Sequence, residues 1–79
     1  MNDQLANSEL GKVIQEMLSL LQKEMNLADS FINDAEKIGD KVDEAFYEGR
    51  FKGLNISYCN LYNKFYEVVD PERPKLTLR

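Results

Sequence analysis

The sequence predicts an all-α protein: a helical hairpin with a long second helix, which assembles into an oligomeric helical bundle. Apolar residues recur at spacings of three and four along most of the chain, the pattern of helices with one buried face. With only 79 residues, a single core rarely supplies more than about 3–5 kcal/mol. The single cysteine, Cys59, and the absence of histidine exclude an intrachain disulfide and the usual structural zinc sites. Self-association is therefore the expected source of further stability.

A first helix is expected over about residues 8–26, capped by Asn7 or Ser8. Its apolar residues form a broad face, made by Leu10, Ile14, Met17 and Leu21 and widened by Val13, Leu18, Leu20 and Met25. A face of this width fits a helix that packs against more than one neighbour. Turn and cap formers gather at residues 26–30, so we expect a tight connection there. One uninterrupted helix through this region is the main alternative.

A second helix is expected over about residues 30–69, so that residues 1–70 form one helical domain. Its aromatic seam comprises Tyr47, Phe51, Leu54, Tyr58, Leu61, Phe65 and Val68. The first half of the same helix is acidic on this side, so the buried and exposed faces change places near its middle. Either the chain turns near residues 49–53, giving a monomeric three-helix bundle, or one long helix packs its aromatic half on another subunit. We favour the long helix, because residues 50–52 offer no good N-cap.

In the long-helix interpretation, the oligomer interface comprises Tyr47, Gly49, Phe51, Gly53, Leu54, Tyr58, Leu61 and Phe65. The glycines, spaced four apart, would let a second backbone approach closely. Pro71 ends the helix, because the residue before a proline is disfavoured in the α conformation. Residues 71–79 are expected to form an extended tail, in which Leu76 and Leu78 either bind a groove of the same or a neighbouring subunit or stay disordered.

The net charge of −4 has a local origin between residues 29 and 48. This segment holds Asp29, Asp34, Glu36, Asp40, Asp43, Glu44 and Glu48 against Lys37 and Lys41. An acidic body disfavours direct binding to nucleic acid, whose affinity depends on Lys and Arg contacts to phosphate. It favours a protein partner with a basic surface. Asp40, Asp43, Glu44 and Glu48 have spacings that suit Mg²⁺, but the first helix offers only scattered acids, so we expect a solvated face, no metal and no cofactor.

We expect no enzymatic activity. The chain has no histidine for acid–base chemistry near neutral pH, and Gly49 and Gly53 do not form a phosphate-binding loop. Cys59 has no neighbouring base and is expected to be a packed, inert thiol. Tyr62 and Tyr66 lie beside the seam among asparagines, and they form either a recognition surface or the edge of a small core.

These features predict a small acidic interaction protein that binds a larger protein and inhibits or adapts it. The expected partner-binding residues are Asp40, Asp43, Glu44, Glu48, Tyr62 and Tyr66. One alternative is an oligomeric binder of a small anionic ligand such as a nucleotide, with Tyr47, Arg50, Lys52 and Asn55 as its site. Another alternative is a structural assembly subunit.

In composition the chain is similar to small accessory proteins of phages and mobile elements of low-GC bacteria, many of which block a host protein. No apolar run approaches the roughly 18–20 residues of a membrane span, and the first residues show no signal-peptide pattern. We therefore expect a cytoplasmic protein, in its own cell or in a host, without membrane contact.

Overall fold

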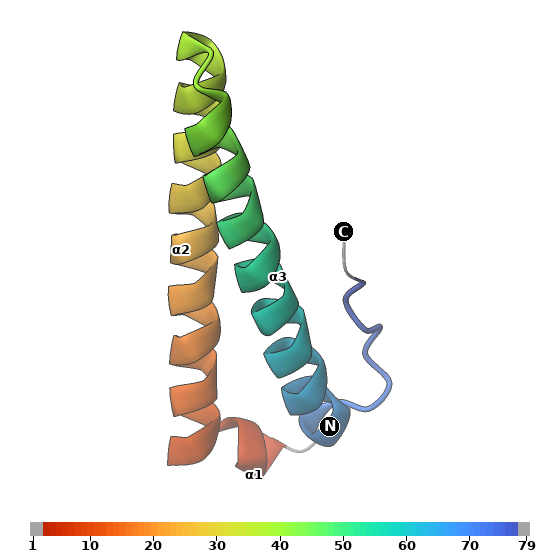
Figure 1. Cartoon of the computed structure of the whole chain (residues 1–79). Helices are drawn as coiled ribbons and strands as arrows, with labels where there is room; N and C mark the ends of the chain where they lie inside the picture. The colour runs from red at the N-terminus through yellow and green to blue at the C-terminus, as the bar shows by residue number, and fades with distance from the viewer. Residues whose placement is uncertain (1–2, 78–79) are drawn as a thin grey trace.

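The computed structural model describes residues 3–77 as a hairpin of two long antiparallel helices (Figure 1). α1 is a single turn at Asp3–Ala6, α2 spans Glu9–Ile38 and α3 spans Lys41–Val69. Within residues 3–77 there is no strand. The all-α class, and the packing of one long helix on a second, are therefore confirmed.

The turn between the two long helices lies at Gly39 and Asp40. Gly39 has a φ of 74°, in the left-handed region that glycine adopts without strain. The amides of Gly39 and Asp40 donate to the carbonyl oxygens of Glu36 and Ala35 at 3.2 and 2.9 Å, which is the Schellman arrangement of a helix C-terminus. Asp40 also caps α3, because its side chain accepts a hydrogen bond from the amide of Asp43 at 3.0 Å.

The connection expected at residues 26–30 is wrong, and the alternative of an uninterrupted helix is correct for this region. Asn26 and Asp29 are exposed on α2. Asn26 accepts a hydrogen bond from the side chain of Gln22, one turn earlier, at 3.0 Å. A polar residue on the solvent side of a helix does not compete with the backbone when its side chain bonds to a neighbouring turn. The turn-forming residues here are therefore part of a helix surface.

Because the turn lies later than expected, α2 and α3 have nearly equal lengths and run antiparallel, close together at the turn and farther apart at the other end (Figure 1). The core face of α2 repeats at intervals of three and four and comprises Gly11, Ile14, Leu18, Leu21, Met25, Ala28, Ile32 and Ala35. From Tyr47 to Phe65, the aromatic seam of α3 is half-buried or buried within the single chain, whereas Val68 is 57% exposed. The seam expected to pack on another subunit packs on α2 instead.

The glycines of the two helices have different surroundings. α3 continues through Gly49 and Gly53, so the three-helix alternative is wrong, and no atom lies within 4 Å of where a Cβ would stand at either residue. Among residues 3–77, no backbone segment packs closely against these two glycines. At Gly11, by contrast, a Cβ would lie 2.7 Å from the carbonyl oxygen of Ala6 and closer still to that of Leu5. Gly11 therefore allows α1 to cross the start of α2.

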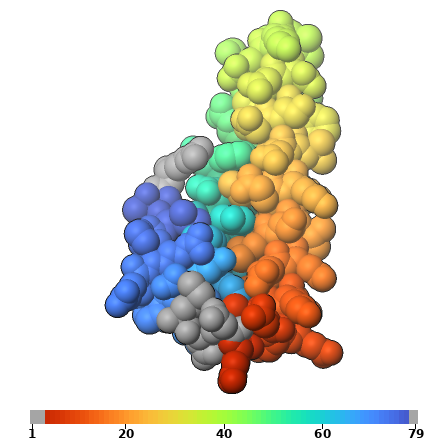
Figure 2. Space-filling model, turned by 180° about the vertical axis from the view of Figure 1, so that it is seen from behind, coloured from red at the N-terminus to blue at the C-terminus, as the bar shows by residue number. Residues whose placement is uncertain are grey.

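The hairpin is thin, with principal extents of 49, 22 and 14 Å. These are extents of the Cα trace, and the two long helices lie side by side in a single layer. We call the end with the Gly39 turn the tip and the end with α1 the base. The tail after Val69 runs back beside the base half of α3, and the tip projects beyond it (Figures 1 and 2). Asn63 bonds the backbone of Leu76 twice, at 2.9 and 3.1 Å, whereas Leu78 lies outside the described residues.

Candidate functional site

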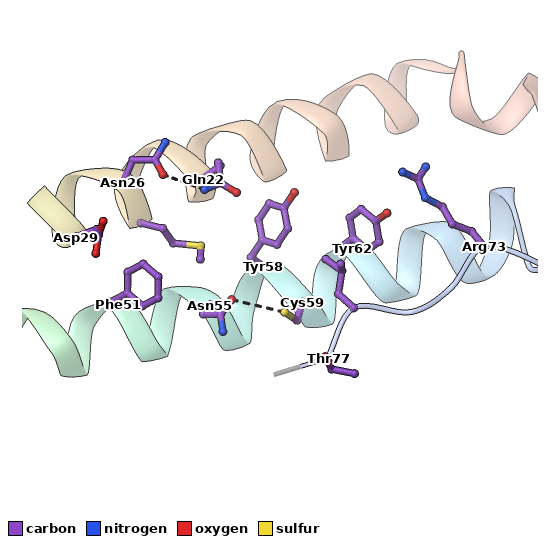
Figure 3. Close-up of a pocket in the computed structure, with 12 residues that line it drawn as sticks. Gln22, Asn26, Asp29, Phe51, Asn55, Tyr58, Cys59, Tyr62, Arg73 and Thr77 are labelled. Carbon is purple, nitrogen blue, oxygen red and sulfur yellow. Dashed lines mark hydrogen bonds between the residues drawn. The ribbon is translucent and has the colours of Figure 1, made fainter. Parts of the chain in front are cut away.

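A cleft of about 600 Å³ lies between α2, α3 and the tail (Figure 3). Polar side chains from all three segments line it, among them Gln22, Asn26, Asn55, Tyr58, Tyr62 and Arg73. Met25 and Phe51 add apolar surface, and the rings of Tyr58 and Tyr62 point from α3 into the space between the helices (Figure 3). The volume lies in the usual range of small-molecule sites, about 300–1,000 Å³. Its lining suits a ligand that has both polar groups and a flat ring.

Arg73 of the tail lies over two tyrosine rings. Its guanidinium carbon is 4.1 Å from the ring centroid of Tyr66 and 5.3 Å from that of Tyr62, within the range of cation–π attraction. The ring centroids of Tyr58 and Tyr62 are 6.0 Å apart, and those of Tyr62 and Tyr66 are 4.5 Å apart. Tyr62 and Tyr66 are thus half-buried beneath the tail and do not form an open helix face.

Tyr58 and Cys59 lie at the floor of the cleft. Burial raises the pKa of the Tyr58 phenol above its ordinary value of 10.0, Tyr62 and Tyr66 raise it further, and Arg73 lowers it. Tyr58 is therefore a neutral hydrogen-bond donor in this cleft. Cys59 is buried, and its sulfur lies 3.7 Å from the side-chain oxygen of Asn55, in agreement with the packed thiol expected from the sequence.

The structure does not bring together the residues expected to bind an anionic ligand, which are Tyr47, Arg50, Lys52 and Asn55. Asn55 lines the cleft, but Lys52 is exposed elsewhere on α3. Arg50 pairs with Glu24 of α2 at 3.0 Å, and Tyr47 packs on Phe31 with ring centroids 4.8 Å apart. The cation of the cleft is Arg73. Sequence reasoning missed it, because only the leucines of the tail were expected to bind a groove.

The acidic residues expected to bind a partner lie at the tip. Asp43 and Glu48 are exposed, whereas Asp40 and Glu44 are half-buried. Asp40 caps α3, as described above, and Glu44 forms an ion pair with Lys41 at 3.7 Å. The tip is therefore an acidic surface in which two of the four acids also have a structural role.

Tyr62 and Tyr66 lie far from this acidic surface. About 20 residues of α3 separate the two groups, which corresponds to about 30 Å at 1.5 Å per residue. The six expected partner-binding residues consequently form two surfaces, one at the tip and one beneath the tail near the base.

Three carboxylates converge at the tip from both long helices. One side-chain oxygen each of Glu36, Glu44 and Glu48 lies within 4.8 Å of the other two. The turn at Gly39 places Glu36 of α2 next to Glu44 and Glu48 of α3. Sequence analysis expected the turn at residues 26–30 and therefore did not predict that these three acids lie together. One oxygen of Glu44 is buried without a hydrogen-bond partner among the described residues, although the ammonium of Lys41 lies 3.7 Å from it. Such a set offers oxygen ligands to a divalent cation, and exposed acids also gather in this way as a solvated surface.

A stripe of large apolar side chains remains uncovered on α2. Its members are 39–78% exposed and comprise Leu10, Val13, Met17, Leu20, Leu27, Phe31 and Ile38. We call these seven residues the α2 stripe. From Leu10 to Phe31, every stripe residue directly precedes a residue of the core face in the sequence. The cleft residues Gln22, Asn26 and Asp29 each directly follow a residue of the core face. One residue is a rotation of about 100° on a helix, so the stripe and the cleft lie on opposite faces of the hairpin.

The stripe joins further apolar surface at both ends of the hairpin. At the base, an apolar pocket of about 210 Å³ is lined by Leu5, Leu10, Gly11, Ile14, Leu61, Lys64, Phe65 and Val68. At the tip, Ile38, Val42 and Phe46 are 78%, 79% and 62% exposed. Sequence reasoning recognised that the apolar face of the first helix was too broad for one neighbour, but it did not separate the core face from the stripe.

Comparison of the chain with protein-family models, with curated protein sequences and with solved structures found no match. Among the described residues, no helix is both long enough and apolar enough to cross a membrane. The function is therefore argued from the surfaces of the hairpin alone.

Proposed function

We propose that this chain is an interaction protein, an oligomeric helical module that binds a larger protein with a basic surface and inhibits or adapts it. In this proposal it acts in the cytoplasm of its own cell or of a host. The observation that carries the proposal is the exposed apolar surface of a hairpin that has a single layer of helices. Stable domains pack at least two layers of secondary structure around a core. A single layer with an uncovered apolar face is suited to contact with other chains.

The acidic tip supports a basic partner. Asp43 and Glu48 are exposed there, and the tip projects beyond the tail (Figure 2). Clustered charges of one sign accelerate association with an oppositely charged surface and favour it over other partners. Association through the tip would therefore weaken as the salt concentration rises.

The proposal is tested by reversing the two exposed acids of the tip. The Asp43→Lys/Glu48→Lys variant leaves Asp40 and Glu44 in place, so the cap and the Lys41 ion pair remain. Immobilised wild type and variant are compared for proteins retained from the source cells at 0.15 M and 0.5 M salt. Any retained protein is then purified, and its dissociation constant is measured by calorimetry.

The expected result is a protein that binds the wild type at 0.15 M salt and binds the tip variant at least ten-fold more weakly. The matched control is Glu67→Lys/Glu72→Lys, which makes the same charge change at two exposed positions near the base. Equal binding by wild type, tip variant and control would contradict the proposal. A chain without any outside partner would instead support the structural assembly subunit.

The cleft favours a second candidate function, the binding of a small anionic ligand. Arg73 supplies the positive charge, and Tyr62 and Tyr66 supply aromatic rings. A panel of nucleotides at 1 mM should then raise the melting temperature of the wild type, and Arg73→Ala should abolish that increase. Lys75→Ala, in the same tail, is the control. A flat response over the panel would remove this candidate.

A further inference from the structure

We infer that the α2 stripe is a dimerisation surface, on which a second copy of this chain packs antiparallel about a two-fold axis near Glu24. The two hairpins then form a four-helix bundle. This inference rests on the oligomeric part of the proposed function and is independent of the acidic tip, because the stripe and the tip acids are different residues.

The size of the uncovered surface requires a partner of similar length. Seven large side chains that are each 39–78% exposed present apolar surface on the order of 600 Å², the upper end of what a monomer leaves open. The stripe runs the length of α2, about 45 Å at 1.5 Å per residue. A stable interface buries about 800 Å² on each partner, an area that the stripe reaches together with the apolar tip and base. An identical helix has the length and the repeat to cover it.

The two ends of the hairpin are complementary to each other. At the tip, Ile38, Val42 and Phe46 are exposed apolar side chains. At the base, the apolar pocket has a volume of about 210 Å³, several times the roughly 30 Å³ that one water occupies in the liquid. An antiparallel arrangement brings the tip of each copy to the base of the other. The same contact then forms twice, as a two-fold interface requires.

The charges beside the stripe favour the same direction. Glu9, Lys12, Glu16 and Lys37 are exposed one position before the stripe residues Leu10, Val13, Met17 and Ile38, so they form one row along its edge. An antiparallel second copy places its Lys37 at the level of residue 11, where two acids, Glu9 and Glu16, outnumber one base, Lys12, whereas a parallel copy places Lys37 beside Lys37. Such pairs set the orientation of packed helices.

A parallel arrangement would instead place like charges together. In a parallel dimer the acidic tips would lie side by side. Glu24 does not decide the direction, because near the two-fold axis it faces Glu24 of the second copy in either arrangement, and it keeps its own partner, Arg50, at 3.0 Å. The separation of the two acidic tips is what favours helices that run in opposite directions.

The first test is the molar mass in solution, measured by light scattering from 2 to 200 μM protein at 0.15 M salt. The wild type should have twice the chain mass of 9.2 kDa. Leu20→Asp places a charge in the middle of the stripe, at a side chain that is 60% exposed in the single chain. It should weaken the dimer at least 100-fold, give 9.2 kDa and retain helical circular dichroism.

The matched control is Ile56→Asp, at a side chain that is 47% exposed. Ile56 is two residues from both Leu54 and Tyr58 of the seam, so it lies on the far side of α3, and this variant should remain dimeric. A wild type that is monomeric at 200 μM, or a Leu20→Asp variant that is still dimeric, would overturn the inference.

Distances between spin labels on the otherwise wild-type protein determine the direction of packing. They also test the dimer if the Leu20→Asp variant loses its helical structure. Labels are placed at Lys23→Cys and Lys41→Cys, with Cys59→Ser removing the native thiol. Antiparallel packing places the two Lys23 labels near each other. It separates the Lys41 labels by about 40 Å, since Lys41 lies at the tip next to the end of α2 at Ile38, about 14 residues of α2 from the centre at 1.5 Å per residue. Short distances at both positions indicate a parallel dimer and overturn the proposal, as do long distances at both.

Discussion

The two faces of the hairpin differ in what covers them. On one face the tail runs over the helices, Arg73 lies on two tyrosine rings and Asn63 binds the backbone of Leu76. On the other face the α2 stripe is largely exposed within the described part of the chain, although Tyr47 packs on Phe31 near the tip. A short polar tail is sufficient for the first face, because amides, phenols and a guanidinium are satisfied by a few directional contacts.

The apolar second face requires a partner that covers a large area. Apolar surface gains free energy in proportion to the area removed from water, about 25 cal/mol per Å², so only a long partner covers the stripe effectively. The difference is that the chain covers its polar face with its own tail, whereas most of its apolar face is exposed within the described residues.

The largest expected effect is the contrast between a buried and an uncovered side chain. Phe65 is 5% exposed and Leu20 is 60% exposed. Phe65→Ala should lower the free energy of unfolding by about 3–5 kcal/mol, because it removes a ring from the core and leaves a cavity. Leu20→Ala should change it by less than about 0.5 kcal/mol in dilute protein. Urea unfolding followed by circular dichroism measures both.

Repeating this experiment at 2 and 200 μM separates an open stripe from a covered one. A dimer links stability to protein concentration. The loss caused by Leu20→Ala should therefore increase at the higher concentration, whereas an unchanged small loss would indicate that the stripe stays open.

A smaller effect is expected from the tail. Arg73→Ala removes the guanidinium from the rings of Tyr62 and Tyr66 and should lower stability by about 0.5–1 kcal/mol, the usual value for an exposed cation–π contact. Amide hydrogen exchange of residues 70–77 should become faster at the same time. Lys75→Ala serves as the control, and equal exchange in the two variants would show that Arg73 does not hold the tail.

The smallest effect concerns Tyr58 at alkaline pH. Its pKa is raised in the folded chain above 10.0, first by burial and then by neighbouring tyrosines. The folded state therefore favours the protonated phenol, so this contribution to stability is complete below pH 10 and is lost as the pH rises through the folded pKa. Unfolding between pH 9 and 11.5 should show a decline that Tyr58→Phe reduces. An equal decline in both proteins would contradict the assignment to Tyr58.

The sequence predicted the helical class and the burial of the seam, because periodicity reports directly which side of a helix is apolar. It did not locate the turn, because the apolar line from Phe31 to Ala45 continues through Gly39 as if the helix were unbroken. The dipeptide Gly39-Asp40 was the available signal, since glycine ends helices and aspartate begins them. Asn26 and Asp29 are turn formers as well, and only the packing of α3 along α2 decides between the two places.

The incorrect expected position of the turn, at residues 26–30, also led to the incorrect predictions about the interface and binding residues. With a shorter first helix, the Tyr58–Phe65 part of the seam had no partner in the same chain, so it was assigned to another subunit. With the turn at Gly39, α2 covers this seam, and the unpaired apolar surface is the α2 stripe. Glu36 and Arg73 were missed for a related reason. Each reaches its neighbours only after the chain reverses direction, which local spacing does not report.

The two-residue turn at Gly39 and Asp40 also has a consequence for the order of folding. Residues on either side of it are close in the chain, so their contacts cost little loop-closure entropy, and chains dominated by such local contacts fold within microseconds to milliseconds. Pairing of α2 and α3 should therefore begin at the tip and proceed towards the base. The first refolding phase should have a rate independent of protein concentration, and only a later phase, in which two complete hairpins associate, should become faster in more concentrated solution.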